Sequence, residues 1–518
     1  MFTGNYQTLL GIGAYLIAMI IIGLHYVRRG KTSLGDYYLA NRGFGPWTAS
    51  MGAGAADMSG WLLLGLPGVA YFTGMGEAFW TALGLFIGTC VNWMVVARRL
   101  RSYSIIADNS ITLPEFLSRR FRDKNNFLSV IAATINLVFF SLYTSAQFIT
   151  FGKLFNYLFG ANMVAMIIVG AFIVVFYTLL GGLRAVGMTN LVQGLLMAFA
   201  LAMVLAFGYF HAGGIKNIAG NLRDFPRFTD FFGIASPGTV GGLQITSGGV
   251  PVFGPGTHYS FLNIESAMAW GLGYFGMPHI LIRFMAVNKA SMIRPARFIA
   301  ITWCFIVLAA AVSIGLIGRA LFPTTLNSSS SSENIFIILS MNLFPPLLTG
   351  VVISGILAAS MSSADSYMLM VSSSLALDIY KGVLKKEASD NEVIWVGRIT
   401  MLLATVFGVA VAVSGNQSIF QVVSYAWAGL GAAFGPLILF SLFWKRTTLP
   451  AAVTGMITGC VMVVLWKNVI ADFGGIFAVY ELLPAFIISS LAIVFVSLLT
   501  KKPSEEISKE FAEAVQGQ

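Results

Sequence analysis

The most constraining feature of this sequence is a series of long apolar runs that recur along the whole chain. A helix needs about 20 mostly apolar residues to cross the hydrocarbon core of a bilayer, where unpaired backbone groups are too costly. Hydropathy places such runs near residues 7–27, 45–72, 78–97, 127–157, 162–182, 186–210, 266–287, 298–320, 335–378, 395–414, 418–443, 449–467 and 479–500. We therefore expect an all-α polytopic membrane protein with about 13 transmembrane helices.

The composition leaves little room for a soluble domain. Hydrophobic residues make up 57% of the chain and charged residues 10%, whereas soluble domains carry about 25% charged residues. The longest hydrophilic connection, residues 211–265, is a Gly-rich and Ser-containing stretch that we expect outside the membrane. We expect one transmembrane transporter domain over residues 1–500 and a cytoplasmic tail over 501–518. The mixed charges of the tail fit a short amphipathic helix or an ordinary solvated face.

Lysine and arginine alternate between successive connections, as the positive-inside rule requires. Basic residues follow the odd-numbered runs, starting with Arg28, Arg29 and Lys31 after the first and a cluster over 98–124 after the third. This alternation predicts an N-terminus outside and a C-terminus in the cytoplasm. The net charge of +10 then reflects loops that face anionic lipid, so membrane lipid is the expected partner and nucleic acid is not.

Two of the runs are unusually interrupted. The second contains Gly52, Gly54, Gly60 and Pro67, and the seventh contains Gly271, Gly273, Gly276 and Pro278. Interrupted helices in corresponding halves of a transporter indicate a binding site at the membrane midplane, although such glycines also serve close helix packing. The five-run separation suits two repeats of five helices, over about 45–210 and 266–443. In the ninth run, residues 344–346 predict a short helix followed by a full span.

Two polar clusters fall inside apolar runs. Asp57 lies in the second run, and a carboxylate in the membrane is a functional candidate because an unpaired charge is costly there. Its alternative role is to accept backbone N–H groups freed at a helix break. In the ninth run, Ser362, Ser363, Asp365 and Ser366 lie within about one helical turn. Serine hydroxyls and freed carbonyls are ligands that suit a hard cation such as Na+.

Aromatic residues gather in the same interrupted runs. Trp61, Trp270 and Tyr274 belong to them, and Tyr143 is available from the fourth run. They could hold a small ring, or they could serve packing and interfacial anchoring. No lysine or arginine falls clearly in the middle of a run, which favours a neutral or zwitterionic solute over a dicarboxylate.

The sequence gives no sign of an enzyme or a bound cofactor. There is no HExxH or GxSxG pattern, and the four histidines are scattered along the chain. Cys90, Cys304 and Cys460 all lie inside apolar runs, where they are expected to be small packing residues. We therefore expect neither an enzyme nor a disulfide framework, and no cofactor.

Five ordered segments resemble the sodium:solute symporter family, and within it the bacterial sodium/proline symporters. They are ADMSGWLLLGLPG at 56–68, ITLPEFLSRRF at 111–121, AWGLGYFGMPHILIRFMA at 269–286, EVIWVGRI at 392–399 and VSYAWAGLGAAFGPLILFS at 423–441. The resemblance implies a five-plus-five inverted-repeat fold in the bacterial inner membrane. It also implies Na+-coupled uptake of a small zwitterion, with L-proline as the first choice.

The resemblance also implies site residues. For Na+ they are the carbonyls of Ala55, Met58 and Ala359 and the hydroxyls of Ser362 and Ser363, with Asp57 and Asp365 nearby. For the solute they are Trp61, Tyr143, Trp270, Tyr274 and Pro278, and Arg42 matches a residue near the cation path.

The sequence departs from the family pattern at two positions. Asn190 stands where the family commonly has an acidic residue, and Asp365 could supply that charge instead. Met277 stands where proline symporters can carry glutamine, which leaves the solute open. The alternatives are another amino acid or a small carboxylate, H+ in place of Na+, or a membrane sensor.

Overall fold

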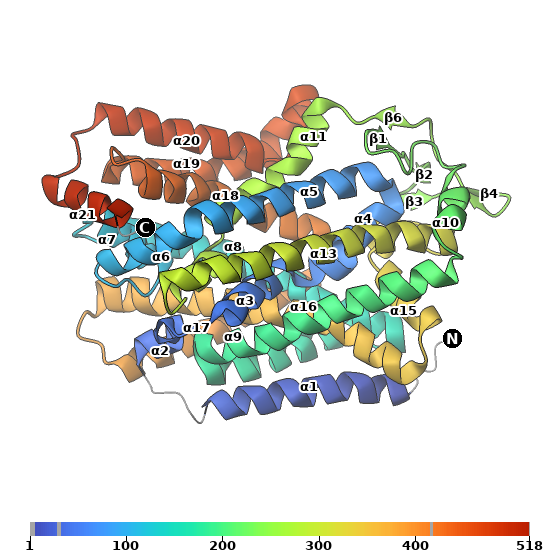
Figure 1. Cartoon of the computed structure of the whole chain (residues 1–518), viewed down its shortest axis with the longest axis horizontal. Coiled ribbons are helices and arrows are strands. Elements are labelled where there is room, and N and C mark those ends of the chain that lie inside the picture. Colours follow the sequence, from blue (N-terminus) through green and yellow to red (C-terminus); the bar gives the residue numbers. More distant parts are fainter. Residues whose placement is uncertain (1–5, 28–32, 415–417, 517–518) are drawn as a thin grey trace.

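The chain folds into a bundle of long helices that run side by side along its longest axis (Figure 1). The computed structural model describes residues 6–27, 33–414 and 418–516. The long helices are α1 Tyr6–Val27, α5 Met75–Val91, α8 Phe127–Phe159, α9 Met163–His211, α13 Ile293–Leu321, α16 Pro346–Ser373, α17 Asp390–Ser414, α18 Ile419–Phe443, α19 Leu449–Leu465 and α20 Leu482–Leu499. The basic residues Arg28, Arg29 and Lys31 lie outside the described residues.

The described residues contain ten helices that are long and apolar enough to cross a membrane. Each of the ten matches a run predicted from the sequence, which confirms the all-α polytopic class. The count of about 13 is not confirmed by this measure, because the runs at 45–72, 162–182 and 266–287 do not form single long helices. The run at 162–182 ends at Gly182, whose φ of 56° and ψ of −170° bend α9.

The second run is broken near its middle, as predicted. It consists of α3 Pro46–Gly60, a π-helical turn η2 Trp61–Gly65 and α4 Leu66–Thr73. Ser59 departs from helical geometry, with φ 50° and ψ −174°. The freed amide of Gly60 donates to the side-chain oxygen of Gln147 (3.2 Å), and the amide of Trp61 donates to the Ser59 hydroxyl (3.2 Å). These bonds replace helical hydrogen bonds that the break removes.

The seventh run is also broken, as predicted. It consists of α11 Phe261–Met268, a 3-10 segment η4 Ala269–Gly276 and α12 Pro278–Met285, with Met277 extended between them. Two side chains from other elements hold its carbonyls. Trp427 Nε1 donates to the carbonyl of Trp270 (2.8 Å), and Asn92 Nδ2 donates to that of Tyr274 (3.0 Å).

The ninth run is a short helix followed by a long one, which confirms the prediction from residues 344–346. The short helix is α15 Ile335–Leu343, and α16 continues into a π-helical end, η6 Ser374–Leu384. Almost every α16 side chain is buried, because α16 packs against α1, α3, α8 and α9. The serine cluster of α16 therefore lies in the centre of the protein.

The two ends of the bundle differ (Figure 1). At one end lie α2 Leu34–Leu39, η1 Ala40–Arg42, α7 Leu113–Arg120, η5 Ala290–Met292, the tail helix α21 Glu505–Gln516 and α6 Ala97–Ile106, which η3 Asn92–Val96 joins to α5. At the other end, residues 211–265 form α10 Ile215–Leu222 and three two-stranded antiparallel sheets. These pair β1 Gly233–Ile234 with β6 Thr257–His258, β2 Thr239–Val240 with β3 Leu243–Gln244, and β4 Thr246–Ser247 with β5 Val250–Pro251.

Short elements also close the remaining connections. They are α14 Ser329–Ser332 before α15, and η7 Trp466–Ile470, η8 Ala471–Phe473 and η9 Gly475–Phe477 between α19 and α20. The tail forms the amphipathic helix that its sequence allowed: Phe511 and Ala514 of α21 are buried, whereas Glu506 and Lys509 are exposed.

Candidate ion- and solute-binding site

The serine cluster of α16 meets the broken helix α3. The Ser362 hydroxyl donates to the carbonyl of Ala55 (2.7 Å) and to that of Ala359 (3.0 Å), and the Ser363 hydroxyl lies 3.4 Å from the same Ala55 oxygen. All four residues are fully buried. The structure therefore brings together two hydroxyl and two carbonyl oxygens, which is a donor set that suits a hard monovalent cation.

Met58 lies one turn further along α3, at the break. Its side chain is 3% exposed, and its carbonyl accepts the amide of Trp61. The fifth residue of the predicted cation set therefore follows Ala55 on the same helix, and its carbonyl is engaged within the break.

Asp57 joins the two broken runs. The hydroxyl of Tyr274 donates to its carboxylate at 2.5 Å. The alternative role considered for Asp57, accepting the amides freed at the break, belongs instead to Ser59 and Gln147. Asp57 thus serves a contact between helices rather than a local cap.

A small cavity lies between the broken helices. It is lined by Asp57, Met58, Trp61, Leu85, Tyr143, Trp270, Tyr274, Val423 and Trp427. Four of the five predicted solute residues line it. The fifth, Pro278, instead begins α12. The rings of Trp61 and Trp270 stack at 5.4 Å, and Phe420 lies 5.3 Å from the Trp270 ring.

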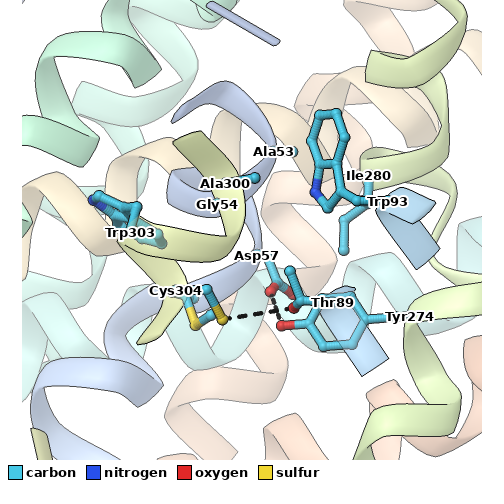
Figure 2. Close-up of a pocket in the computed structure, with 11 residues that line it drawn as sticks. Ala53, Gly54, Asp57, Thr89, Trp93, Tyr274, Ile280, Ala300, Trp303 and Cys304 are labelled. Atoms are coloured by element: carbon cyan, nitrogen blue, oxygen red, sulfur yellow. Dashed lines mark hydrogen bonds between the residues drawn. The ribbon is translucent and has the colours of Figure 1, made fainter. Parts of the chain in front are cut away.

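A second small cavity lies on the other side of the Asp57–Tyr274 pair. Figure 2 shows Asp57 and Tyr274 facing each other, with Thr89 beside them and Trp93 and Trp303 on either side. Cys304 contacts the Thr89 hydroxyl at 3.6 Å, which is consistent with a packing role for this thiol. Because Asp57, Met58 and Tyr274 line both cavities, the Asp57–Tyr274 hydrogen bond is part of the wall between them.

The sequence interpretation missed a buried arginine. Arg283 of α12 is fully buried, and its guanidinium donates to the Ser366 hydroxyl (2.7 Å) and to the carbonyl of His279. Arg283 does not lie in the middle of its run, but it places a buried positive charge beside the serine cluster. Its position near the end of the seventh run concealed it, because the break shortens the run and places α12 inside the protein.

Asp365 and Asn190 belong to one buried network beside the cation cluster. The Asp365 carboxylate accepts from the hydroxyls of Tyr177 (2.9 Å) and Ser366 (2.9 Å). Asn190 Nδ2 donates to the Ser362 carbonyl (3.2 Å) and lies 3.1 Å from the Ser366 hydroxyl. The carboxylate at 365 and the amide at 190 therefore lie on either side of Ser366.

Arg42 lies outside the membrane-spanning segments, near the end of α12. It donates to the carbonyl of Met285 (2.6 Å) and to the Ser104 hydroxyl (3.0 Å). Burial, together with the nearby charge of Arg101, lowers the pKa of Arg42 to about 10, so the guanidinium stays protonated at neutral pH. Arg42 thus ties α12 to the end of α6.

Three further residues shape the site without having been predicted. Gln147 holds the break in the second run, and Asn92 and Trp427 hold the carbonyls of η4. Asn92 and Gln147 are polar residues within apolar runs, which is a signal that the sequence did contain. Trp427 lay within a segment that carried the family resemblance, but nothing in its spacing indicated the cavity.

The fold and this site define a multi-pass membrane transporter with two broken helices at its centre. Among solved structures, the same fold occurs in the substrate-bound outward-open state of a Na+-coupled sialic acid symporter. The TM-score is 0.76 at 17% identity, over 97% of this chain and 99% of that one. A structure of Mhp1, a nucleobase-cation-symport-1 family transporter, matches with a TM-score of 0.54 at 11% identity, over 92% of this chain and 98% of that one.

The family follows from the sequence comparisons. The model of the sodium:solute symporter family matches residues 37–459. The osmoregulated proline transporter OpuE of Bacillus subtilis (strain 168) is 39% identical over 500 residues, 96% of each chain. The sodium/proline symporter of Staphylococcus aureus (strain USA300 / TCH1516) is 39% identical over 505 residues, 96% of this chain and 94% of that one. The chain belongs to the sodium:solute symporter family.

Proposed function

We propose that this protein couples the entry of Na+ to the uptake of L-proline by alternating access. The observation that carries the proposal is the meeting of the Ala55 carbonyl with the Ser362 and Ser363 hydroxyls, beside the small cavity between the two broken helices. The relatives named as proline transporters support the choice of solute.

In this proposal, Na+ binds the carbonyls of Ala55, Met58 and Ala359 and the hydroxyls of Ser362 and Ser363. The hydroxyl protons of both serines turn away from the carbonyls when the cation arrives, because a hydroxyl oxygen that binds a cation does so with its lone pairs. Na+ therefore bridges α3 and α16 and stabilises the break in the second run. Asp57 and Asp365 supply negative charge nearby.

Proline occupies the cavity between Trp61, Tyr143, Trp270 and Tyr274. Trp61 Nε1 has no hydrogen-bond partner in the described part of the chain, so it is available to a carboxylate of the solute. The apolar faces of Trp61 and Trp270 suit the pyrrolidine ring. Pro278 acts indirectly by starting α12 beside the cavity, and Arg42 acts on the inner path.

The membrane placement completes the proposal. The protein lies in the bacterial cytoplasmic membrane with its N-terminus outside, and residues 501–518 form a cytoplasmic tail to the domain over 1–500. The repeats over about 45–210 and 266–443 rock against each other to expose the site to each side in turn. Each Na+ that crosses 100 mV contributes about 2.3 kcal/mol, or roughly a fortyfold solute gradient. No covalent step is required.

The test is uptake of radiolabelled L-proline into proteoliposomes under an inward Na+ gradient or an equal K+ gradient. We expect uptake with Na+ alone, and we expect Ser362→Ala to raise the half-saturating Na+ concentration about tenfold. Ser313→Ala is the matched control, because the Ser313 hydroxyl bonds within its own helix α13. Equal uptake in both salts would contradict Na+ coupling and would favour H+ coupling or facilitated transport instead. Uptake of another solute alone would keep the coupling and reject proline.

A further inference from the structure

The wall of the solute cavity opposite α3 is formed by one face of α18. Val423 and Trp427 lie one turn apart on this helix, and both line the cavity. The next two positions on the same face are Gly431 and Gly435. The face therefore changes from bulky side chains at the cavity to bare backbone beyond it.

The bare part of this face touches the backbone of η4. A Cβ on Gly276 would lie 2.6 Å from the amide nitrogen of Gly435, and a Cβ on Gly431 would lie 2.9 Å from Gly273 Cα. These distances are too short for any side chain, so the two segments pack backbone to backbone. The position of η4 relative to α18 is consequently fixed at this contact.

Trp427 continues the same contact into the cavity. A Cβ on Gly273 would lie 2.0 Å from Trp427 Nε1, so the indole covers the Gly273 backbone directly. Its ring also meets the ring of Tyr274 edge to face at 5.2 Å. Trp427 is 2% exposed and its N–H donates to the Trp270 carbonyl (2.8 Å), so the indole has a single fixed place.

We propose that Trp427 determines the largest solute that the cavity accepts, and that its N–H positions Trp270 against that solute. This inference rests on the proposed function and deepens it. The solute class is a small cyclic amino acid that lies against Trp61 and Trp270 in the cavity, and whose growth by one methylene is blocked by the indole of Trp427.

Two substitutions distinguish the two roles of Trp427, which are to limit the size of the solute and to position Trp270. Trp427→Leu removes most of the ring and opens the wall, whereas Trp427→Phe keeps an aromatic ring and removes the N–H. A pocket that excludes one methylene by contact gives a discrimination of roughly 10- to 200-fold. A lost hydrogen bond to a carbonyl costs roughly three- to tenfold in affinity.

The experiment compares the uptake of proline and of pipecolate, its homologue with a six-membered ring, in proteoliposomes. We expect Trp427→Leu to raise the pipecolate-to-proline ratio of kcat/KM at least about tenfold. Trp427→Phe should change this ratio much less but raise KM for both solutes roughly three- to tenfold. Trp395→Leu is the control, because Trp395 is 61% exposed on α17, away from the cavity.

Val423→Ala provides a second, milder opening of the same wall and should raise the ratio in the same direction. An unchanged ratio in Val423→Ala and in Trp427→Leu, with uptake retained, overturns the inference. If Trp427→Leu does not fold, the pipecolate-to-proline ratio of Val423→Ala alone tests the inference. If the wild-type protein carries neither solute, the proposed function fails. The size limit is then tested with whichever solute it carries and the homologue one methylene larger.

Discussion

The Tyr274 hydroxyl donates to the Asp57 carboxylate at 2.5 Å and thereby joins the two broken runs at the wall between two cavities. Hydrogen bonds to a charged group are among the stronger ones in a protein, because the partner left behind is a buried charge. This contact links the segment beside the cation cluster to the segment that lines the solute cavity.

We expect Tyr274→Phe to raise KM for the solute by about tenfold or more, because Asp57 loses its donor and the wall loses its fixed geometry. The measurement is the concentration dependence of uptake at saturating Na+. Tyr209→Phe is the control, because Tyr209 is 39% exposed on α9. An unchanged KM would mean that the contact has no part in solute binding.

The carboxylate of Asp365 should influence cation binding, because it lies in the network that reaches Ser362 through Ser366 and Asn190. We expect Asp365→Asn to raise the half-saturating Na+ concentration by about tenfold or more, since a buried charge near the cation is removed. If Na+ dependence is the same as in the wild type, Asp365 does not replace the acidic residue missing at position 190. The exchange Asn190→Asp in the Asp365→Asn background should restore part of the loss.

Gly60 should not tolerate a side chain, because a Cβ there would lie 2.6 Å from Thr150 Oγ1. We expect Gly60→Ala to lower the unfolding temperature and to cost about 1–3 kcal/mol through overpacking. Thr150→Ala removes the two nearest atoms and should recover most of the loss in the double variant. Thermal unfolding in detergent measures the stability of the single and the double variant. A double variant no better than Gly60→Ala would locate the cost elsewhere at the break.

The tail helix α21 should be held at the end of the bundle chiefly by Phe511, which lies 5.1 Å from the Arg99 guanidinium and 5.3 Å from that of Arg120. We expect Phe511→Ala to release α21, because a buried aromatic ring and its cation–π contacts are lost together. Trypsin cleavage after Lys509 should then be roughly tenfold faster, as a loss of about 1.4 kcal/mol implies. Val515→Ala, on the exposed part of the helix, should leave the cleavage rate unchanged.

The breaks in the second and seventh runs were predictable, because glycine and proline at their centres weaken a helix in any surroundings. The exact geometry was not. Ser59 adopts its non-helical conformation because Gln147 supplies a side-chain acceptor from α8, which lies far away in the sequence. A single sequence does not indicate which distant side chain completes a break.

The candidate site also contains residues that the sequence predicted and residues that it did not. Ser362 and Ser363 stood out because their hydroxyls lie in an apolar run, and the structure places them against Ala55. Arg283 and Trp427 did not stand out. Whether an arginine near the end of a run is buried depends on how a broken helix is placed, and whether a tryptophan lines a cavity depends on packing between helices.

The most direct test of the account is Na+ movement driven by the solute. Proteoliposomes with equal Na+ on both sides are given an inward gradient of L-proline, and the uptake of radioactive sodium is followed. Because coupling is reciprocal, the account predicts that the proline gradient drives Na+ inward although Na+ has no gradient of its own, and that Ser362→Ala weakens this movement at Na+ concentrations below its raised half-saturating value. Proline entry without any movement of sodium would contradict Na+ symport.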